Sequence, residues 1–190
     1  MAGKLVATTA VMALLAGLLG LSALALFTDT ASVPGNSFST GTVTISTSPT
    51  SAQVTFSGMA PGDQVTNPIT VSNDGSLELR YSVTSTTTED VLAAQLDLTI
   101  KSGVTTCTNA GFGVDGTVVY PTNDLGSVAG TNVIGDPAQL FQVGDRTMAA
   151  SSSEVLCFNV SLPSSTGNTF QGLTTTATFA YQAEQTTNNP

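Results

Sequence analysis

The chain contains no histidine and no tryptophan, and only four of its 190 residues are lysine or arginine. Without histidine it cannot build an HExxH zinc site, a Ser-His-Asp triad or the usual Cys-His pair. Four basic residues against 13 acidic ones leave no clusters for nucleic-acid phosphates, and they disfavour binding to anionic membranes. Few aromatic residues disfavour a sugar platform for a two-carboxylate glycosidase. We therefore expect no enzyme, no catalytic residue, no metal and no cofactor.

The aspartates offer one weak signal for a cation site. Asp115, Asp124 and Asp136 could contribute oxygen ligands to calcium, but the sequence has no DxDxDG loop. Most aspartates lie at predicted turns, where a solvated, turn-forming role is the ordinary one. The triplet at 159–161 (NVS) matches a glycosylation acceptor, but it lies inside a predicted strand and we interpret it as strand sequence.

A long apolar run opens the chain. Lys4 is the only charge in a nearly continuous apolar segment that ends at Phe27, and Ala23 and Ala25 form a small-x-small site. This pattern is typical of a secretory signal peptide, with cleavage after Ala25 and a mature chain that begins at Leu26. The length of the run also permits the alternative of an uncleaved membrane anchor or pilin-like N-terminal helix.

The chain has two cysteines, Cys107 and Cys157, and both follow the predicted cleavage site. In an exported chain an even pair predicts a disulfide. The bond would close a loop of about 50 residues, worth roughly 4 kcal/mol on the chain-entropy estimate. The alternative is a pair of buried free thiols.

Short runs with an apolar residue at every second position predict antiparallel sheets with one buried face each. Turn signals separate them, at 61–62 (PG) and at 73–75 (NDG), which is typical of an all-β sandwich. Short helices are predicted in the connections at 89–94 and 137–142. The less regular stretch 105–146 reads as an insertion. The alternating runs are Val43/Ile45, Val54/Phe56, Ile69/Val71, Leu79/Tyr81/Val83, Leu96/Leu98/Ile100, Val118/Tyr120, Leu156/Phe158/Val160/Leu162 and Leu173 to Tyr181.

Several short motifs, in order, resemble the TasA/camelysin family of secreted proteins, which a dedicated SipW-type signal peptidase processes. The motifs are ALFTD at 25–29, NSFSTGTV at 36–43, MAPGD at 59–63, ITVSNDGSL at 69–77, and NTFQGL at 168–173 running into a strand that ends at 181–183 (YQA). They cover roughly residues 1–85 and 165–185. Camelysin-type members carry a metalloprotease label, but we expect no protease activity from a chain without histidine.

The resemblance implies a jelly-roll-like antiparallel β-sandwich that polymerises into extracellular fibres, similar also to archaeal bundling pilins. In such fibres the freed N-terminal segment of one subunit acts as a donor strand in its neighbour. Here the donor would begin at Leu26, with Phe27, Val33 and Phe38 as candidate anchors. The alternative for Phe27 and Val33 is the first strand of the subunit's own sheet.

These arguments divide the chain into four parts and name its partners. The expected partners are further copies of the chain joined head to tail, the signal peptidase and an accessory anchoring protein, with the membrane involved only before cleavage. The competing hypothesis is a membrane-tethered surface domain. The expected parts are a signal peptide at 1–25, a donor-strand segment at 26–38, a β-sandwich at 39–184 and a flexible tail at 185–190.

Overall fold

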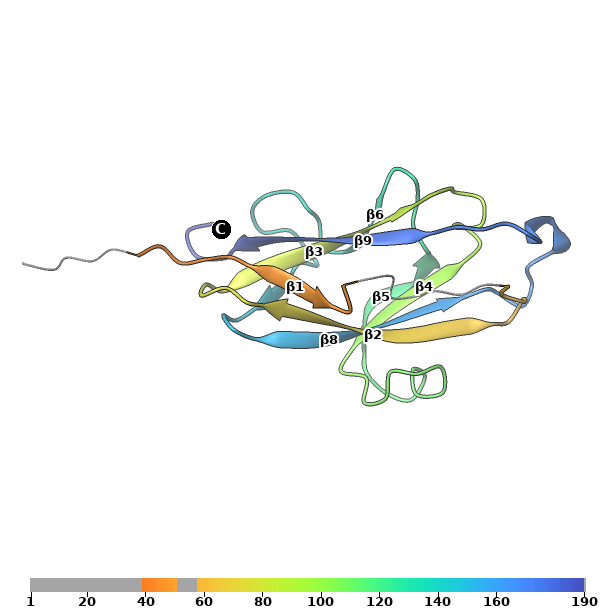
Figure 1. The fold of residues 1–190 in the computed structure, drawn as a ribbon, viewed down its shortest axis with the longest axis horizontal. Helices are drawn as coiled ribbons and strands as arrows, with labels where there is room; N and C mark the ends of the chain where they lie inside the picture. Colours follow the sequence, from red (N-terminus) through yellow and green to blue (C-terminus); the bar gives the residue numbers. More distant parts are fainter. Residues whose placement is uncertain (1–38, 51–57, 190) are drawn as a thin grey trace, which may run out of the picture. The chain divides into compact units, whose positions relative to one another are not determined.

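Strands make up nearly all of the regular structure (Figure 1). The structure is a computed structural model, and it describes residues 39–50 and 58–189. In these ranges the strands are β1 (Ile45–Ser48), β2 (Gln64–Asn73), β3 (Leu79–Thr87), β4 (Asp97–Ser102), β5 (Thr117–Asp124), β6 (Thr131–Ile134), β7 (Arg146–Met148), β8 (Ser153–Ser161) and β9 (Ala177–Gln185), with a single 3-10 turn, η1 (Asn168–Phe170), before β9.

The strands form two antiparallel sheets. One has the order β1-β2-β8-β4-β5. In the other, β9 pairs with β3 along its whole length, and the short strands β6 and β7 share the opposite side of β3. The chain crosses from one sheet to the other between β2 and β3, β3 and β4, β5 and β6, β7 and β8, and β8 and β9. This arrangement confirms the predicted all-β sandwich class.

Alternation in the strands builds one shared core. Leu156 and Phe158 on β8 are buried with Leu79, Tyr81 and Val83 on β3, which belongs to the other sheet. Because successive side chains of a strand point to opposite faces, each strand presents an apolar row to the core and a row rich in threonine and serine to the outside. Burying a large apolar side chain contributes roughly 1.5–3 kcal/mol. The core therefore holds the two sheets together.

The two predicted turns are present, and their side chains explain them. Gly62 has a φ of 99°, as the third position of a type II turn requires, and the Asp63 N–H donates to the Ala60 carbonyl at 2.9 Å. In the second turn, the side chain of the buried Asn73 accepts from the Gly75 N–H at 3.0 Å. These bonds fix where β2 begins and ends.

The predicted helices at 89–94 and 137–142 are wrong. The first is a series of turns, although Glu89 accepts from backbone N–H groups as a helix-capping acid would. β4 begins at Asp97, so the chain has no room to extend those turns. In the second segment Leu140 adopts a φ of 74°, which no α-helix tolerates. The predictions also missed β6 and β7.

A polar bridge joins the two sheets at one end of the core. The Tyr81 hydroxyl on β3 donates to the Glu154 carboxylate on β8 at 2.8 Å. Arg146 on β7 donates to both oxygens of the same carboxylate. Burial, reinforced by the Glu154 charge, raises the pKa of the Tyr81 hydroxyl, so it remains a donor at all ordinary pH values.

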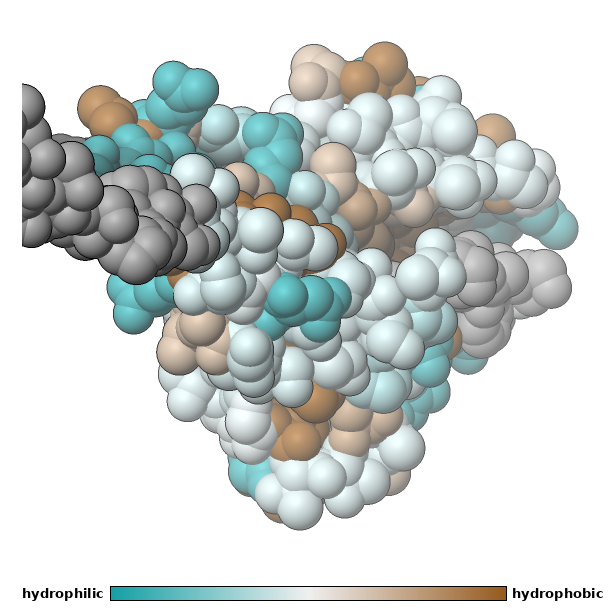
Figure 2. Space-filling model, turned by 60° about the vertical axis from the view of Figure 1, so that its left-hand side comes forward, coloured by the Kyte–Doolittle hydropathy of each residue, from teal (hydrophilic) through white to brown (hydrophobic). Residues whose placement is uncertain are grey.

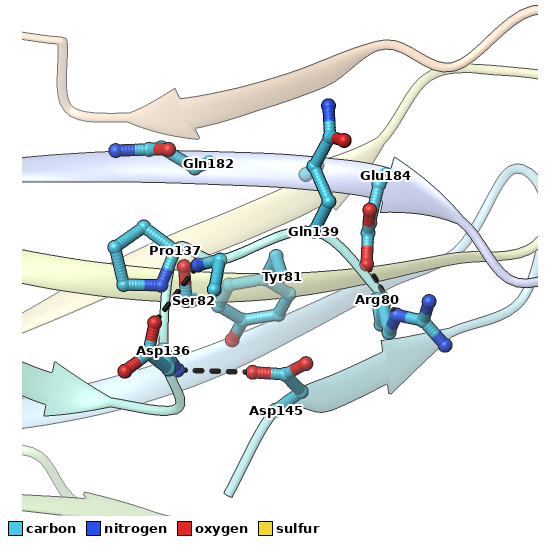
Figure 3. Close-up of a pocket in the computed structure, with 11 residues that line it drawn as sticks. Arg80, Tyr81, Ser82, Asp136, Pro137, Gln139, Asp145, Gln182 and Glu184 are labelled. Carbon is cyan, nitrogen blue, oxygen red and sulfur yellow. Dashed lines mark hydrogen bonds and ion pairs between the residues drawn. The ribbon is translucent and has the colours of Figure 1, made fainter. Parts of the chain in front are cut away.

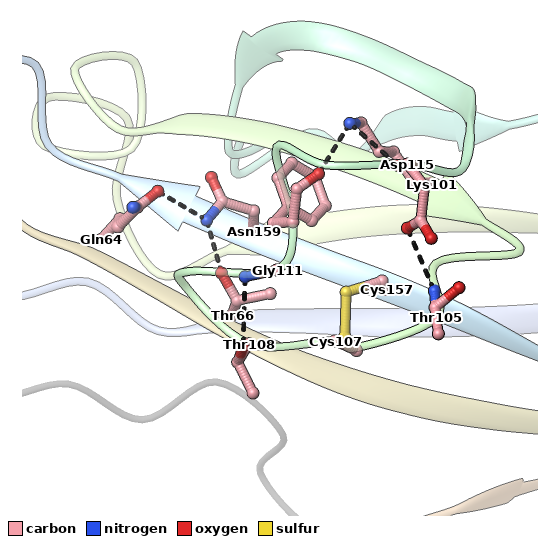
Figure 4. Close-up of a disulfide and its surroundings, with 11 residues drawn as sticks. Gln64, Thr66, Lys101, Thr105, Cys107, Thr108, Gly111, Asp115, Cys157 and Asn159 are labelled. Carbon is pink, nitrogen blue, oxygen red and sulfur yellow. Dashed lines mark hydrogen bonds between the residues drawn. A yellow bond between two sulfur atoms is a disulfide. The ribbon is translucent and has the colours of Figure 1, made fainter.

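A disulfide holds a long loop against the outer face of the five-stranded sheet (Figure 4). Cys107, in the segment after β4, bonds to Cys157 on β8, a residue that alternates with the core residues of that strand. The Lys101 ammonium lies 4.7 Å from the centre of the Phe112 ring and donates to the Phe112 carbonyl at 2.7 Å. The first part of the stretch 105–146, which was interpreted as an insertion, therefore covers this face of the sheet.

Asn159, the first residue of the possible glycosylation triplet, is buried within β8. Its amide donates to the Gln64 side chain at 3.0 Å and to the Thr66 hydroxyl at 2.6 Å (Figure 4). An amide so engaged offers no acceptor for a glycan in the folded protein, which agrees with the interpretation of this triplet as strand sequence.

The end of the described chain is bound to β3. The Arg80 guanidinium donates to Glu184 at 2.6 Å and to the Asn189 carbonyl at 2.5 Å. The Thr186 N–H donates to the Glu78 carbonyl at 3.2 Å. Residues expected to form a flexible tail therefore make specific contacts. Within 39–50 and 58–189, no helix has the length and apolar character to cross a bilayer.

Loss of the disulfide should lower the free energy of unfolding by about 4 kcal/mol, because the bond restricts a loop of about 50 residues in the unfolded chain. The measurement is urea unfolding of the mature exported protein beside a Cys107→Ala/Cys157→Ala variant. Reductant should lower the midpoint of the natural protein and leave that of the variant unchanged. Equal midpoints for the two proteins without reductant would contradict the prediction.

Candidate functional site: an unpaired strand edge

β9 is a nine-residue strand that uses only one of its two edges. It pairs with β3 from Leu79↔Gln185 to Thr87↔Ala177, and no other described strand pairs with it. Figure 1 shows β9 at the margin of its sheet, beside β1 of the other sheet. A strand in this position presents a row of backbone donors and acceptors that its own sheet does not use.

The register shows which backbone groups these are. The Thr88 N–H donates to the Thr176 carbonyl at 3.1 Å just before β9, and the Thr186 N–H donates to the Glu78 carbonyl at 3.2 Å just after it. In an antiparallel pair such bonds recur at every second residue. The even-numbered residues of β9 therefore bond to β3. The odd-numbered ones, at 177, 179, 181 and 183, direct their N–H and C=O groups to the unpaired edge.

The same odd-numbered residues place their side chains against the core, yet they stay only partly buried. Phe179 packs edge-on against Phe158, with ring centres 5.0 Å apart, and Tyr181 lies 6.3 Å from Tyr81. The Tyr181 hydroxyl is buried and has no hydrogen-bond partner among the described residues, and burial raises its pKa. The edge therefore combines free backbone groups with an incompletely covered apolar row, which is what an added strand can use.

Other strand margins carry features that prevent pairing. β5 contains Pro121, which has no N–H, and ends at Asp124. β1 has only four residues, and Pro49 follows it directly. β6 and β7 have four and three residues. Short length, proline and charge are the usual protections of sheet edges. Along β9 there is no proline, and the only charge is Glu184, which is paired with Arg80.

Most of the surface on the face shown in Figure 2 is weakly polar. On the face shown in Figure 2, apolar patches lie apart from one another, and some of this apolar surface lines a hollow. A strand that binds this protein therefore gains little from charge. It would depend on backbone hydrogen bonds and on burying apolar side chains.

The residues predicted for processing and donation all lie outside the described ranges. They are Ala23, Ala25, Leu26, Phe27, Val33 and Phe38. The predicted strand around Val54 and Phe56 lies outside them as well. Cys107 and Cys157 are described, and they form the disulfide. The unpaired edge of β9 was missed, because the sequence shows the strand but not which of its sides is paired.

The structure does not assemble the possible calcium ligands. Asp115 accepts from the Thr105 N–H at 3.1 Å, whereas Asp136 accepts from the Ala138 N–H at 2.8 Å in a different loop. Asp124 closes β5. Among the described residues, no three acidic or cysteine side chains come together in a way that could hold a metal ion.

Hydrogen exchange should reveal the unpaired edge. In the monomeric mature protein, the amides of Ala177, Phe179, Tyr181 and Ala183 should exchange faster than those of the even-numbered residues between them, because only the latter bond to β3. Residue-resolved exchange by NMR measures this directly. Equal protection of odd and even positions along β9 would show that the edge is already paired.

Comparison with known proteins gives one result. A family model described as camelysin metallo-endopeptidase matches residues 1–189, so the match includes the middle of the chain that the sequence motifs leave out. No individually curated protein matches the sequence.

The description of this family implies a catalytic metal, and the residues present do not fit one. The chain has no histidine, and its two cysteines are joined to each other rather than free as thiolate ligands. Among the described residues no three carboxylate or cysteine side chains come together, and several of the carboxylates are engaged in turns and ion pairs. The match nevertheless extends over nearly the whole sequence, and the chain therefore belongs to the camelysin metallo-endopeptidase family.

Proposed function

We propose that this protein is a structural subunit that polymerises into extracellular fibres, with the N-terminal segment of one copy added to β9 of the next. The family is one of secreted biofilm-matrix proteins, and this supports an extracellular role for the chain. The observation that carries the proposal is the long, unprotected edge of β9. Since neither the sequence nor the described residues supply a catalytic constellation, the role proposed is structural.

The predicted donor segment matches this edge in length and pattern. Within the predicted donor segment 26–38, residues 26–33 precede Pro34 and Gly35, so this first part of the segment would have about the length of the nine-residue β9 when extended. Phe27 and Val33 are six positions apart, which places both side chains on one face of a strand. That face would cover the half-buried row on β9, and the donor backbone would bond to the free N–H and C=O groups of the odd-numbered residues.

This geometry produces a filament. The donor lies at one end of the sequence and the acceptor is β9, so each joint uses two different surfaces. Contacts of this head-to-tail kind extend indefinitely unless the rotation between subunits closes them into a ring. Cleavage after Ala25 would free the donor, so that processing by the signal peptidase becomes the switch for assembly.

A proline at residue 183 should block assembly while leaving the subunit folded. The N–H of Ala183 points to the unpaired edge, so an Ala183→Pro variant loses a donor to the incoming strand but no bond to β3. The mature protein is collected from cells that export the full chain and imaged by electron microscopy at rising concentration. We expect thin regular filaments from the natural protein and none from the variant.

The matched control is Ala183→Ser, which keeps the N–H and should form filaments normally. Thermal unfolding and NMR spectra of both variants show whether each is folded as a monomer. Filaments of normal number from the folded proline variant would rule out β9 as the acceptor. The absence of filaments from the natural protein at every concentration would reject the polymerisation itself.

The mature protein should begin at Leu26. N-terminal sequencing of protein from the medium tests this, because the small-x-small site places cleavage after Ala25. A retained apolar N-terminus on cell-associated protein would instead support the alternative of a membrane-tethered surface domain. Leu26 at the N-terminus would exclude that alternative.

A further inference from the structure

The segment that leads into β1 is bound to the turn between β2 and β3. The Thr42 carbonyl accepts from the N–H groups of Ser76 and Leu77 at 3.0 Å and 3.2 Å, and the Thr42 N–H donates to the Ser76 hydroxyl at 3.0 Å. A side chain at Gly75 would lie 2.3 Å from the Thr42 carbonyl oxygen, so this close approach requires glycine. We call residues 41–44 the strap.

The strap and the end of β9 lie at the same end of the two sheets. The Glu78 carbonyl, in the turn that binds the strap, accepts from the Thr186 N–H at 3.2 Å, directly after β9. Figure 1 shows the strap, in orange, extending beyond the end at which the arrow of β9 finishes. Followed toward the N-terminus, the chain therefore leaves the sandwich in the direction in which β9 runs.

This direction decides how a donor segment pairs with β9. In a head-to-tail fibre whose copies follow one another along the strands, the donor extends from the strap into the next copy with its N-terminus leading. Its chain direction is then opposite to that of the β9 strand that receives it, so the pair is antiparallel. A donor that returned to β9 of its own copy would have residue 33 near the strap, because only residues 34–40 lie between them, and it would run parallel to β9.

The side chains of the two strands differ in size in opposite order. The row that β9 turns toward the core has small residues at its ends, Ala177 and Ala183, and large ones between them, Phe179 and Tyr181. The donor row has its apolar anchors at the ends and smaller residues between them. Laid end to end, the two rows therefore place large side chains beside small ones. The donor row is Phe27, Asp29, Ala31 and Val33.

We infer that the donor runs antiparallel to β9 of the next copy in one register, with Phe27 opposite Ala183 and Val33 opposite Ala177. The inference rests on the proposed function and makes its site specific for one alignment of the chain. Opposite residues of an antiparallel pair have Cβ atoms about 4.5–5.5 Å apart, so each anchor lies beside an alanine. A slip of two positions would place Phe27 against Tyr181 and leave one end of the row uncovered.

The one acidic residue of the segment 26–33 favours the same direction. In the antiparallel register Asp29 lies opposite Tyr181, whereas in a parallel alignment of the two rows it lies opposite Phe179. A carboxylate removed from water needs hydrogen-bond donors. The Tyr181 hydroxyl is buried and has no partner among the described residues, so it is free to donate. Phe179 offers no such group.

The outer face of β9 agrees with this register. Gln182 and Glu184 point away from the core, and Figure 3 shows Glu184 beside Arg80, next to a hollow that the loop between β6 and β7 also lines. The register places Thr28 opposite Gln182. A polar side chain then meets a polar one on the exposed side of the pair, and neither anchor is involved.

Engineered disulfides on this exposed side test the register. The even-numbered residues of β9 bond to β3, so they form non-hydrogen-bonded pairs with the donor, with Cα atoms about 4.5 Å apart. This lies within the roughly 4.4–6.8 Å that a disulfide spans. Filaments of a mature Thr28→Cys/Gln182→Cys variant should, after oxidation, give a ladder of covalent multimers on a non-reducing gel.

The matched control is Thr28→Cys/Thr178→Cys, which pairs the same donor position with the residue that a parallel alignment would place opposite it. Both β9 positions are exposed, so both variants should fold and form filaments in electron microscopy. The control should give no ladder. The bond between Cys107 and Cys157 is present in both variants and does not distinguish them.

Four results would overturn the register. They are a ladder from the control alone, a bond formed within single copies of the control, filaments of the Gln182 variant that give no ladder, and loss of filaments in either variant. The second result would show that the segment is the first strand of its own sheet. The third would leave polymerisation standing, whereas natural protein without filaments would reject the proposed function and the register together.

Discussion

β9 leaves one row of its backbone N–H and C=O groups unpaired among the described strands. The need of these groups for hydrogen-bond partners is the constraint on which the rest of this structure depends. A backbone N–H or C=O removed from water without a partner costs as much as a lost hydrogen bond, so it must remain hydrated or be paired. The odd-numbered residues of β9 carry these groups, and they include Phe179 and Tyr181, whose side chains are only partly buried. Water can satisfy the backbone there but not the apolar row. In the proposed assembly, a strand from another copy would satisfy both, which would make addition of a strand more favourable than at an edge that only exposes its backbone.

An open edge is useful only if the sandwich stays closed elsewhere. The Tyr81–Glu154–Arg146 bridge joins the sheets at one end of the core, and the disulfide fixes a cover over the outside of the five-stranded sheet. The carboxylate-bound loop after β6 covers part of the outside of the smaller sheet. These contacts restrict slippage of register, which would move every side chain of a strand to the other face. The unpaired edge of β9 is thus held in a fixed register, as the proposed role of an acceptor requires.

How much of this could be foreseen from the sequence depends on the range of the interactions involved. Alternation at Leu79, Tyr81 and Val83, or along β8, is a local signal, and it located those strands correctly. β6 places Val133 and Ile134 side by side, and β7 has three residues, so neither shows a period of two. Glu89 acted as a capping acid in turns too short to become a helix. The unpaired edge was not predictable, since it depends on which distant strands lie beside β9.

The absence of histidine agrees with the way in which the described carboxylates are used. The description of the family as metallo-endopeptidases suggests a pocket in which metal ligands converge. Among the described residues no such group is present, and several carboxylates instead make structural hydrogen bonds. Asp63, Asp136 and Asp145 hold turns, Glu154 joins the sheets, and Glu184 ties the end of the chain to β3 and the loop to β9. Each of these five carboxylates therefore holds a turn, a loop or a strand in place. Acids used in this way order turns, loops and strand contacts, which is the use of carboxylates that the proposed structural role requires.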